Sequence, residues 1–486
     1  MNEILVIDVG TSSVRAGALN QEGSLHDVIS VPTLPSTPSP GLVEVDGDLI
    51  AKNAIELANK VIESVGSVSG VAITNQRSTS LVWDRNTGEL VAPGIGWQDL
   101  RTVITCIMLQ EQGLRLSPSH SGPKLQSILD DFDKERVKEL CFGTIDTWIA
   151  WKLNGQLGDQ ALHVTDVTNA SATGMATSDF SKWDQDVLAA LNIEASILPE
   201  IKSSSDFMGE ARVLKGSPPI IAIAGDQQAS LVGQACNKPG LAKATFGTGG
   251  MLDQFVGPIR PEFMDLGPNG TTSFAAYKLG SSPTAYEVEA LMLSAGSAVE
   301  WLRDDLGIIS SSEESDELAS QSADNSDVWF VPALLGLGTP VWDFGARGTF
   351  VGITRGTGRA ELVRGVLEGI AQRGADMVEA AEGDSQLSIP SLRIDGGMSA
   401  NKTFVQALAN ACQRPVEVSK EREATTIGAA FLGAIHLGWY GGMDEISSNW
   451  SPKEVIEPNA PSRRERWLEA RSKSLKTIPE LSAITF

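Results

Sequence analysis

Residues Ile4–Ser13 have the sequence ILVIDVGTSS, which is the strongest indication of how this chain folds. Its four leading apolar residues predict a buried strand, and its glycine permits a tight bend in which backbone N–H groups converge on an anion. The next residues, Val14–Leu19, lack helical spacing and predict a strand that returns beside the first. A P-loop would instead end in Gly-Lys-Ser/Thr and open a helix. The stretch therefore predicts a phosphate-binding hairpin, although similar loops occur in ordinary hairpins.

Five side chains of this hairpin are candidate ligands of a nucleotide phosphate or of its metal. Asp8 lies beside the bend, and its carboxylate suits Mg²⁺, which prefers oxygen ligands and keeps part of its water. The other four candidates, all expected on the phosphates, are Thr11, Ser12, Ser13 and Arg15. Because the net charge of −23 does not attract a nucleotide, such local groups must hold it.

A second loop of the same shape lies in the other half of the chain. Leu241–Phe246 is strand-like and leads into GTGG at residues 247–250. Two glycine-hydroxyl bends in corresponding positions predict a duplicated architecture that holds a nucleotide between its halves. The duplication is structural, because no self-similarity of sequence at a fixed period accompanies it.

Strand and helix patterns alternate along the 486 residues, which predicts α/β domains. The chain is too long for one core, and a polar Pro-Gly break at Asn237–Gly240 separates its halves. We therefore expect an N-terminal domain over residues 1–238, a C-terminal domain over residues 239–450 and a helical tail over residues 451–486.

The composition excludes several classes of function. The acidic net charge disfavours nucleic acid and anionic membranes as partners, and no apolar run of about 18 residues predicts a spanning helix. Met1–Glu3 is acidic and leads at once into a strand, so no signal peptide is expected. Four scattered cysteines predict free thiols in a reducing compartment, the cytoplasm. The four histidines lack ligand spacing, which argues against a zinc site.

Asp226 is the candidate catalytic base. It follows the apolar strand at residues 219–224 and opens a helix, which is where α/β folds place reactive groups. Phosphoryl transfer to an alcohol needs alignment, charge neutralisation and one base for the hydroxyl proton. One aspartate that faces two phosphate hairpins meets these needs. The alternative is an ordinary helix N-cap.

Three further loops place binding groups after strands. Arg77 and Trp97 could hold a polyhydroxylated ligand, because polar groups bind its hydroxyls and an indole face covers its C–H groups. The alternatives are a surface salt bridge for Arg77 and core packing for Trp97. The glycines after Asp395, Gly396 and Gly397, would let an adenosine approach closely, or would simply serve a tight turn.

These motifs resemble those of the FGGY carbohydrate kinases, and within that family the pattern is most similar to the glycerol kinases. The resemblance runs in register from about residue 3 to residue 440, through DVGTSS at 8–13, TNQR at 74–77, WQD at 97–99, GDQQ at 225–228, GTG at 247–249 and DGG at 395–397. It implies an actin-like duplicated fold, in which two ribonuclease-H-like domains flank a nucleotide cleft. It also implies a kinase that uses ATP and Mg²⁺ to phosphorylate a hydroxyl of a small polyol or sugar.

The resemblance assigns roles residue by residue. Asp226 matches the general base of the family, and Asp8 falls where the family positions its metal. The positions that match acceptor ligands are Arg77, Trp97 and Gln227. Those that match the two phosphate loops are Thr11, Gly247 and Thr248. Those that fall where the family binds the nucleoside are Gly296, Gly397, Met398 and Asn401.

Two departures from the glycerol kinases concern the acceptor. Ser78 stands where they carry Glu, and Ser119 stands where they carry Tyr. Because both lost groups would hold glycerol hydroxyls, and both serines are smaller, we expect an acceptor larger than glycerol, such as a four- or five-carbon polyol or ketose. Two alternatives stay open: a glycerol kinase that forms glycerol 3-phosphate, and a non-catalytic actin-like nucleotide switch. A homodimer and a homotetramer are both compatible with the sequence.

Overall fold

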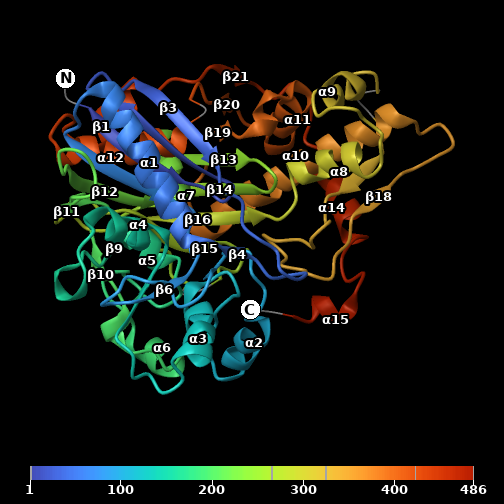
Figure 1. Ribbon diagram of the computed structural model, residues 1–486. Helices are drawn as coiled ribbons and strands as arrows, with labels where there is room; N and C mark the ends of the chain where they lie inside the picture. The colour runs from blue at the N-terminus through green and yellow to red at the C-terminus, as the bar shows by residue number, and fades with distance from the viewer. Residues whose placement is uncertain (1–2, 264–265, 323–325, 422, 485–486) are drawn as a thin grey trace.

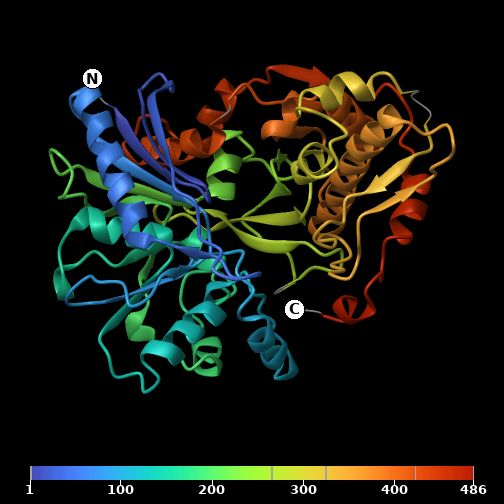
Figure 2. The same ribbon diagram turned by 45° about the vertical axis from the view of Figure 1, so that its right-hand side comes forward.

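The computed structural model describes residues 3–263, 266–322, 326–421 and 423–484. The chain forms two lobes that lie side by side, each built around its own central sheet (Figure 1, Figure 2). Within these ranges, no helix combines the length and the apolar character that crossing a bilayer requires.

The first lobe contains a six-stranded sheet in the order β11-β12-β5-β1-β2-β3. β1 pairs antiparallel with β2 and parallel with β5, which in turn pairs parallel with β12. The β1–β2 hairpin is the one that the opening stretch of sequence predicts. The strands are β1 (Ile4–Val9), β2 (Ser13–Leu19), β3 (Leu25–Pro32), β5 (Gly70–Asn75), β11 (Ser205–Glu210) and β12 (Pro219–Gly225).

Side chains of β1 alternate between two cores on opposite faces of this sheet. Leu5 and Ile7 belong to a core shared with α1 (Gly47–Val65), whereas Ile4 and Val6 belong to a core shared with α12 (Ala424–His436). Because apolar cores cover both faces of β1, its sequence is a continuous apolar run rather than an alternation of apolar and polar residues.

Helix α12 belongs to the C-terminal part of the sequence but packs on the first lobe (Figure 1). It crosses α7 (Asp226–Gly233) at such close range that a Cβ at Gly428 would lie 1.7 Å from the carbonyl oxygen of Ala229. The run of small residues in α12 thus permits two backbones to touch under the cleft, close to the candidate base.

The second lobe contains a seven-stranded sheet in the order β15-β16-β14-β13-β19-β20-β21. β13 pairs antiparallel with β14 and parallel with β19, as β1 pairs with β2 and β5 in the first lobe. The structure therefore confirms the predicted duplication. The strands are β13 (Ala242–Phe246), β14 (Gly250–Gly257), β15 (Thr272–Tyr277), β16 (Ala285–Met292), β19 (Leu392–Asp395), β20 (Val416–Val418) and β21 (Glu454–Ile456).

The two faces of the second sheet differ in character. One face packs apolar residues such as Ala244, Leu252 and Val288 against the long helix α10 (Arg359–Ser385). The opposite face lies against α7 of the first lobe and carries charged residues on β13, β14 and β16. The surface between the lobes is therefore polar at the point where the candidate base lies.

The remaining elements surround these sheets. Those before α7 are β4 (Glu44–Val45), β6 (Leu81–Asp84), β7 (Gly94–Ile95), α2 (Val103–Glu111), α3 (Ser121–Phe132), β8 (Leu140–Gly143), α4 (Ile145–Asn154), β9 (Val164–Asp166), α5 (Val167–Ser171), α6 (Gln185–Ala190) and β10 (Glu200–Lys202). Those after β16 are α8 (Gly296–Asp304), α9 (Glu314–Ala319), β17 (Trp329–Val331), β18 (Thr349–Val351), α11 (Lys402–Cys412), α13 (Met443–Asn449), α14 (Arg464–Ser472) and α15 (Pro479–Ser482).

The segment after residue 450 docks on the second lobe. Its strand β21 forms the edge of the sheet, and in α14 the side chain of Trp467 is fully buried. Arg464 of α14 pairs with Asp376 of α10 at 2.6 Å. The segment after residue 450 thus contributes a strand to the second sheet as well as helices. The boundaries at residues 238 and 450 stay a prediction.

Candidate active site

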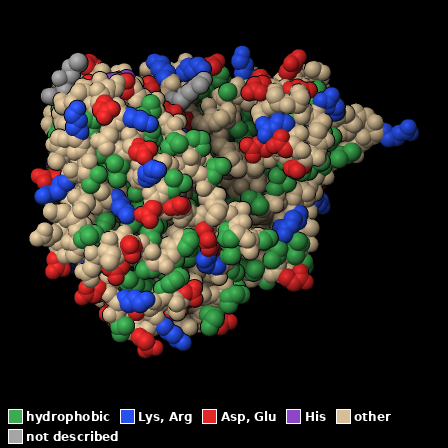
Figure 3. Space-filling view, in the orientation of Figure 1, with side chains coloured by type: hydrophobic (Ala, Val, Ile, Leu, Met, Phe, Trp, Pro, Cys, Tyr) green, Lys and Arg blue, Asp and Glu red, His purple; other side chains and the backbone are tan. Residues whose placement is uncertain are grey.

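The strands that carry the predicted loops end at the junction of the two lobes. β1, β5 and β12 run parallel, so their carboxyl ends lie at one edge of the first sheet, and β13 and β19 do the same in the second. Figure 3 shows the surface hollowed between the first lobe and the part of the second lobe that carries α8 and α9. The carboxyl ends of parallel strands are the usual ligand site of α/β folds.

Asp226 is the first residue of α7, and the N-cap of that helix is Gly225 rather than Asp226. The ordinary N-cap interpretation of Asp226 is therefore wrong. Its carboxylate is 28% exposed and lies 3.6 Å from Nε of Arg77. Burial raises the pKa of the Asp226 carboxyl, against the opposing charges of Arg77 and Lys243. A partly accessible carboxylate with a raised pKa suits a general base.

A buried network holds the strand end that carries Asp226. The backbone N–H of Gly225 donates to the hydroxyl of Thr168 at 2.8 Å, and this hydroxyl donates to Asp166 at 2.8 Å. The side-chain amides of Asn75 and Asn169 bond to each other in both directions. Sequence reasoning missed this network, because Asp166, Thr168 and Asn169 belong to no predicted motif and lie dozens of residues from Asn75 and Gly225.

Arg77 follows β5 and crosses to the second lobe. Its side chain is 9% exposed, its Nη2 donates to Glu289, and its guanidinium lies 5.0 Å from the ring centre of Phe274. The interpretation of Arg77 as a surface salt bridge is therefore wrong, because the pair is buried. Sequence reasoning identified Arg77 but missed Glu289, an acidic residue in a buried strand.

Trp97 joins the acceptor loop to the first phosphate loop. Its indole is half-buried, and Nε1 donates to the hydroxyl of Thr11 at 3.2 Å. The structure thus brings a predicted acceptor ligand beside a predicted phosphate ligand. In the same loop, Ser12 is exposed and Ser13 opens β2.

The two serines that depart from the glycerol kinases have different surroundings. Ser78 is buried with a φ of 62°, and its hydroxyl donates to the carbonyl of Ala172 at 2.9 Å. Ser119 is exposed and hydrogen-bonded to Ser117 at 2.6 Å. The buried Lys124, which sequence reasoning missed, joins their backbones by donating to both carbonyl oxygens.

Asp8 lies under the first phosphate loop. Its Oδ2 accepts from the hydroxyl of Thr426 on α12 at 2.8 Å, and Nη1 of Arg15 lies 3.8 Å away. Burial raises the pKa of Asp8 to about 6, with a smaller contribution from the negative charge of Asp226. The carboxylate of Asp8 is an oxygen donor of the kind that Mg²⁺ binds. Arg15 also pairs with Glu423.

The second phosphate loop rests on the start of α8. Gly247 accepts from the N–H of Gly296 at 2.8 Å, and Thr248 accepts from the N–H of Ala295 at 2.9 Å. A Cβ at Gly296 would lie 2.6 Å from the Gly247 oxygen, so this contact requires glycine, whereas a Cβ at Gly247 would meet nothing within 4 Å. The loop therefore presents an open backbone to a ligand.

The predicted nucleoside residues lie around the end of β19. Gly396 has a φ of 85°, so the tight turn itself requires glycine there, while a Cβ at Gly397 would meet open space. Met398 is 8% exposed. Asn401 caps α11 through the N–H of Phe404 and donates to Ser315, so its amide is held in place. A role for these residues in nucleoside binding stays a prediction.

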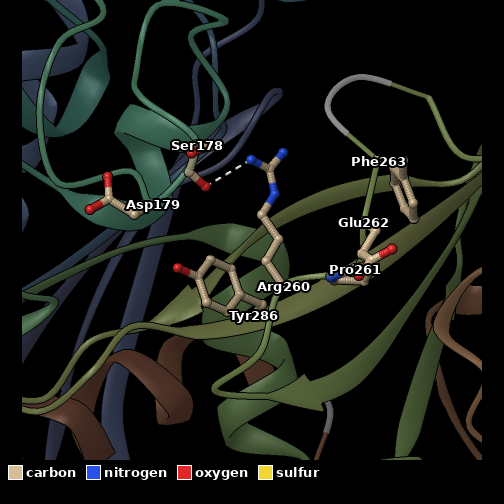
Figure 4. Close-up of a pocket in the computed structure, with 7 residues that line it drawn as sticks. All are labelled: Ser178, Asp179, Arg260, Pro261, Glu262, Phe263 and Tyr286. Atoms are coloured by element: carbon tan, nitrogen blue, oxygen red, sulfur yellow. Dashed lines mark hydrogen bonds between the residues drawn. The ribbon is translucent and has the colours of Figure 1, made fainter.

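A separate pocket lies away from this site (Figure 4). Arg260 of the second lobe reaches across it and donates to the carbonyl of Ser178 at 2.7 Å. Its lining includes none of the predicted site residues; it consists of Ser178, Asp179, Arg260, Pro261, Glu262, Phe263 and Tyr286.

Comparison with known proteins assigns both halves of the chain to one family. The N-terminal domain of the FGGY family of carbohydrate kinases matches residues 3–233, and the C-terminal domain of that family matches residues 268–437. The glycerol kinase of Trichlorobacter lovleyi is 40% identical over 97% of both chains, and glycerol kinase 2 of Thermotoga maritima is 39% identical over 98% of this chain and 99% of its own. The crystal structure of Plasmodium falciparum glycerol kinase with ADP superposes with a TM-score of 0.89 at 28% identity, covering 100% of this chain and 99% of that one.

Proposed function

This chain belongs to the FGGY family of carbohydrate kinases, and from that premise we propose that its acceptor is glycerol. The chain is an ATP-dependent kinase of the actin-like, two-lobed fold. The product of the proposed reaction is glycerol 3-phosphate. The observation that carries the proposed mechanism is the position of Asp226, which is partly exposed beside Arg77 and follows β12 at the sheet edge where β1 also ends.

The proposed reaction needs little covalent help from the protein. As the acceptor oxygen bonds to the γ-phosphorus of ATP, its proton passes to the carboxylate of Asp226. The bond between the γ-phosphorus and the bridging oxygen breaks, and ADP leaves. Removal of the hydroxyl proton by a positioned base typically contributes about 10²–10⁴-fold in rate.

The other predicted residues serve alignment and charge. We assign Arg77, Trp97 and Gln227 to the acceptor, and the backbone and hydroxyls of both glycine loops to the phosphates. Mg²⁺, when bound, would neutralise phosphate charge, and Asp8 is the residue that would hold it, through water. The nucleotide site then includes Thr11, Ser12, Ser13, Arg15, Gly247, Thr248, Gly296, Gly397, Met398 and Asn401.

The names of the relatives favour glycerol over the larger acceptor that the sequence predicts. Relatives called glycerol kinase match almost the full length of this chain at about 40% identity. The hydroxyl of Ser78 is turned to the carbonyl of Ala172, so this residue does not replace the lost carboxylate of the glycerol kinases. Weaker glycerol binding, rather than a different acceptor, is the consequence that we propose.

An acceptor panel tests the proposal. Purified protein with Mg²⁺ and ATP is assayed for ADP release with glycerol, with erythritol and xylitol, and with a five-carbon ketose. We expect the highest kcat/KM with glycerol. Turnover of a larger acceptor with glycerol inert would overturn glycerol but keep the kinase, whereas ADP release that is independent of every acceptor would favour the nucleotide switch. Analytical ultracentrifugation of the same sample would decide between a monomer, a dimer and a tetramer.

A further inference from the structure

Six charged residues meet between the lobes beside the candidate base, and we call them the inter-lobe charge cluster. Arg77 and Asp226 come from the first lobe; Lys243, Asp253, Glu287 and Glu289 come from β13, β14 and β16 of the second. Asp253 stands directly opposite Lys243 on one neighbouring strand and Glu289 on the other, so the three side chains share one face of the sheet. Lys243, Asp253 and Glu287 are fully buried.

Two members of the cluster contact the proposed acceptor ligands from the opposite lobe. Glu289 accepts from Nη2 of Arg77. Nζ of Lys243 donates to Oε1 of Gln227 at 2.6 Å and pairs with Asp253 at 2.6 Å. These two acceptor ligands, Arg77 and Gln227, thus belong to the first lobe, and the groups that hold them belong to the second.

These contacts determine which atoms remain for a ligand. Glu289 holds one end of the guanidinium, while Nη1 of Arg77 is buried and has no hydrogen-bond partner among the residues that the structure describes. In Gln227 the amide oxygen faces Lys243, because an ammonium group can only donate. The amide nitrogen is left for the acceptor, so both ligands offer donors to its hydroxyl oxygens.

We propose that Glu289 and Lys243 are positioning residues, which orient Arg77 and Gln227 for the acceptor without touching it. The inference rests on the proposed function, since it concerns the acceptor of the same site. It also predicts that acceptor binding depends on how the lobes meet, because Arg77 and Gln227 are oriented in this way only when the second sheet lies against α7.

The charges of the cluster decide which substitution tests this inference. Four carboxyl groups face two cations, so removing an acid leaves the cluster closer to neutrality, whereas removing a cation leaves a buried charge unpaired. Burial, opposed by Arg77, raises the pKa of Glu289 to about 7, and burial together with Asp253 raises that of Glu287. We therefore expect the fold to tolerate Glu289→Gln, and we pair Lys243→Met with a compensating Asp253→Asn.

Steady-state kinetics separate positioning from stability. The acceptor is the one that the wild-type protein prefers in the panel. Glu289→Gln should raise the KM of this acceptor about tenfold, because that factor is the cost of one misplaced charge-assisted hydrogen bond. The KM of ATP and the melting temperature should stay unchanged. The pair Lys243→Met with Asp253→Asn should act in the same way through Gln227. The matched control is Glu417→Gln, which removes the partner of Arg393 (3.2 Å) from the same sheet and should leave both KM values unchanged.

Three results would overturn the inference: an acceptor KM of Glu289→Gln within about twofold of the wild type, an equal rise in both KM values, or a lower melting temperature that accounts for the loss. A crystal structure of Glu289→Gln gives an answer that needs no turnover. The inference predicts that the guanidinium leaves Phe274 and turns toward Asp226, and an unmoved Arg77 would refute it. Failure of the wild type to phosphorylate glycerol concerns only the proposed function and is seen before any variant is made.

Discussion

The hydroxyl of Thr168 holds the strand end that carries the base, and the substitution Thr168→Val tests how much the base depends on it. The fully buried hydroxyl accepts from the N–H of Gly225 and donates to Asp166, each at 2.8 Å. Valine has nearly the same shape and makes neither bond. Leaving a buried N–H without a partner costs about 1–3 kcal/mol, and the chain can relieve this cost only by moving Gly225 and, with it, Asp226.

A displacement of the base by about 1 Å is enough to lower kcat by about 10²-fold. We therefore expect Thr168→Val to lose about 10²-fold in kcat, with a melting temperature lower by roughly 1–2 °C for each kcal/mol lost. Thr168→Ser keeps the hydroxyl and should restore both values. The measurements are steady-state kinetics with saturating ATP and acceptor, and thermal unfolding. A valine variant that keeps the wild-type kcat, at whatever stability, would refute the argument.

Three further predictions concern other contacts. Gly428→Ala places a Cβ 1.7 Å from a carbonyl oxygen of α7 and should lower the melting temperature strongly, while Gly441→Ala, whose Cβ has only an ordinary contact at 3.5 Å, should not. Burial lowers the pKa of Lys124 to about 7, so between pH 7 and its ordinary pKa of 10.5 the unfolded state binds the extra proton and stability rises with pH; thermal unfolding of wild type should show this rise relative to Lys124→Met. Trp97→Phe removes the bond to Thr11 and should raise the KM of both ATP and acceptor a few-fold, and a change confined to one substrate would contradict the link between the two loops.

The local features of this fold could be predicted from the sequence. The hairpin of β1 and β2, the matching hairpin of β13 and β14, and the place of Asp226 after a buried strand all follow from short-range patterns of apolar residues, glycine and hydroxyls. Each is confined to about a dozen residues, where strand periodicity and turn chemistry act directly.

The contacts between distant segments could not be predicted in this way. The return of α12 to the first lobe depends on packing against α7, which no local pattern encodes. Lys243, Asp253 and Glu289 become neighbours only through strand register and then meet Arg77 only because the lobes dock. The one available signal was the occurrence of acidic residues within otherwise apolar strands, since a buried carboxylate needs a partner.

The size of the acceptor could not be predicted from local sequence either. Ser78 and Ser119 predict more room than glycerol needs, but Ser78 bonds to the backbone and Ser119 lies exposed beside Ser117. The size of a pocket depends on how such side chains and backbones settle around it, so loss of two larger groups in the sequence does not by itself establish a larger ligand.

The kinetics of Asp226→Asn show whether Asp226 takes the proton of the acceptor, because this substitution removes the base and keeps the shape of the side chain. With glycerol, Mg²⁺ and ATP, we expect a loss of about 10²-fold or more in kcat, with ATP binding unchanged in a calorimetric titration. A variant that phosphorylates glycerol at the wild-type rate would rule out Asp226 as the base, because the proton of the acceptor would then leave by another route.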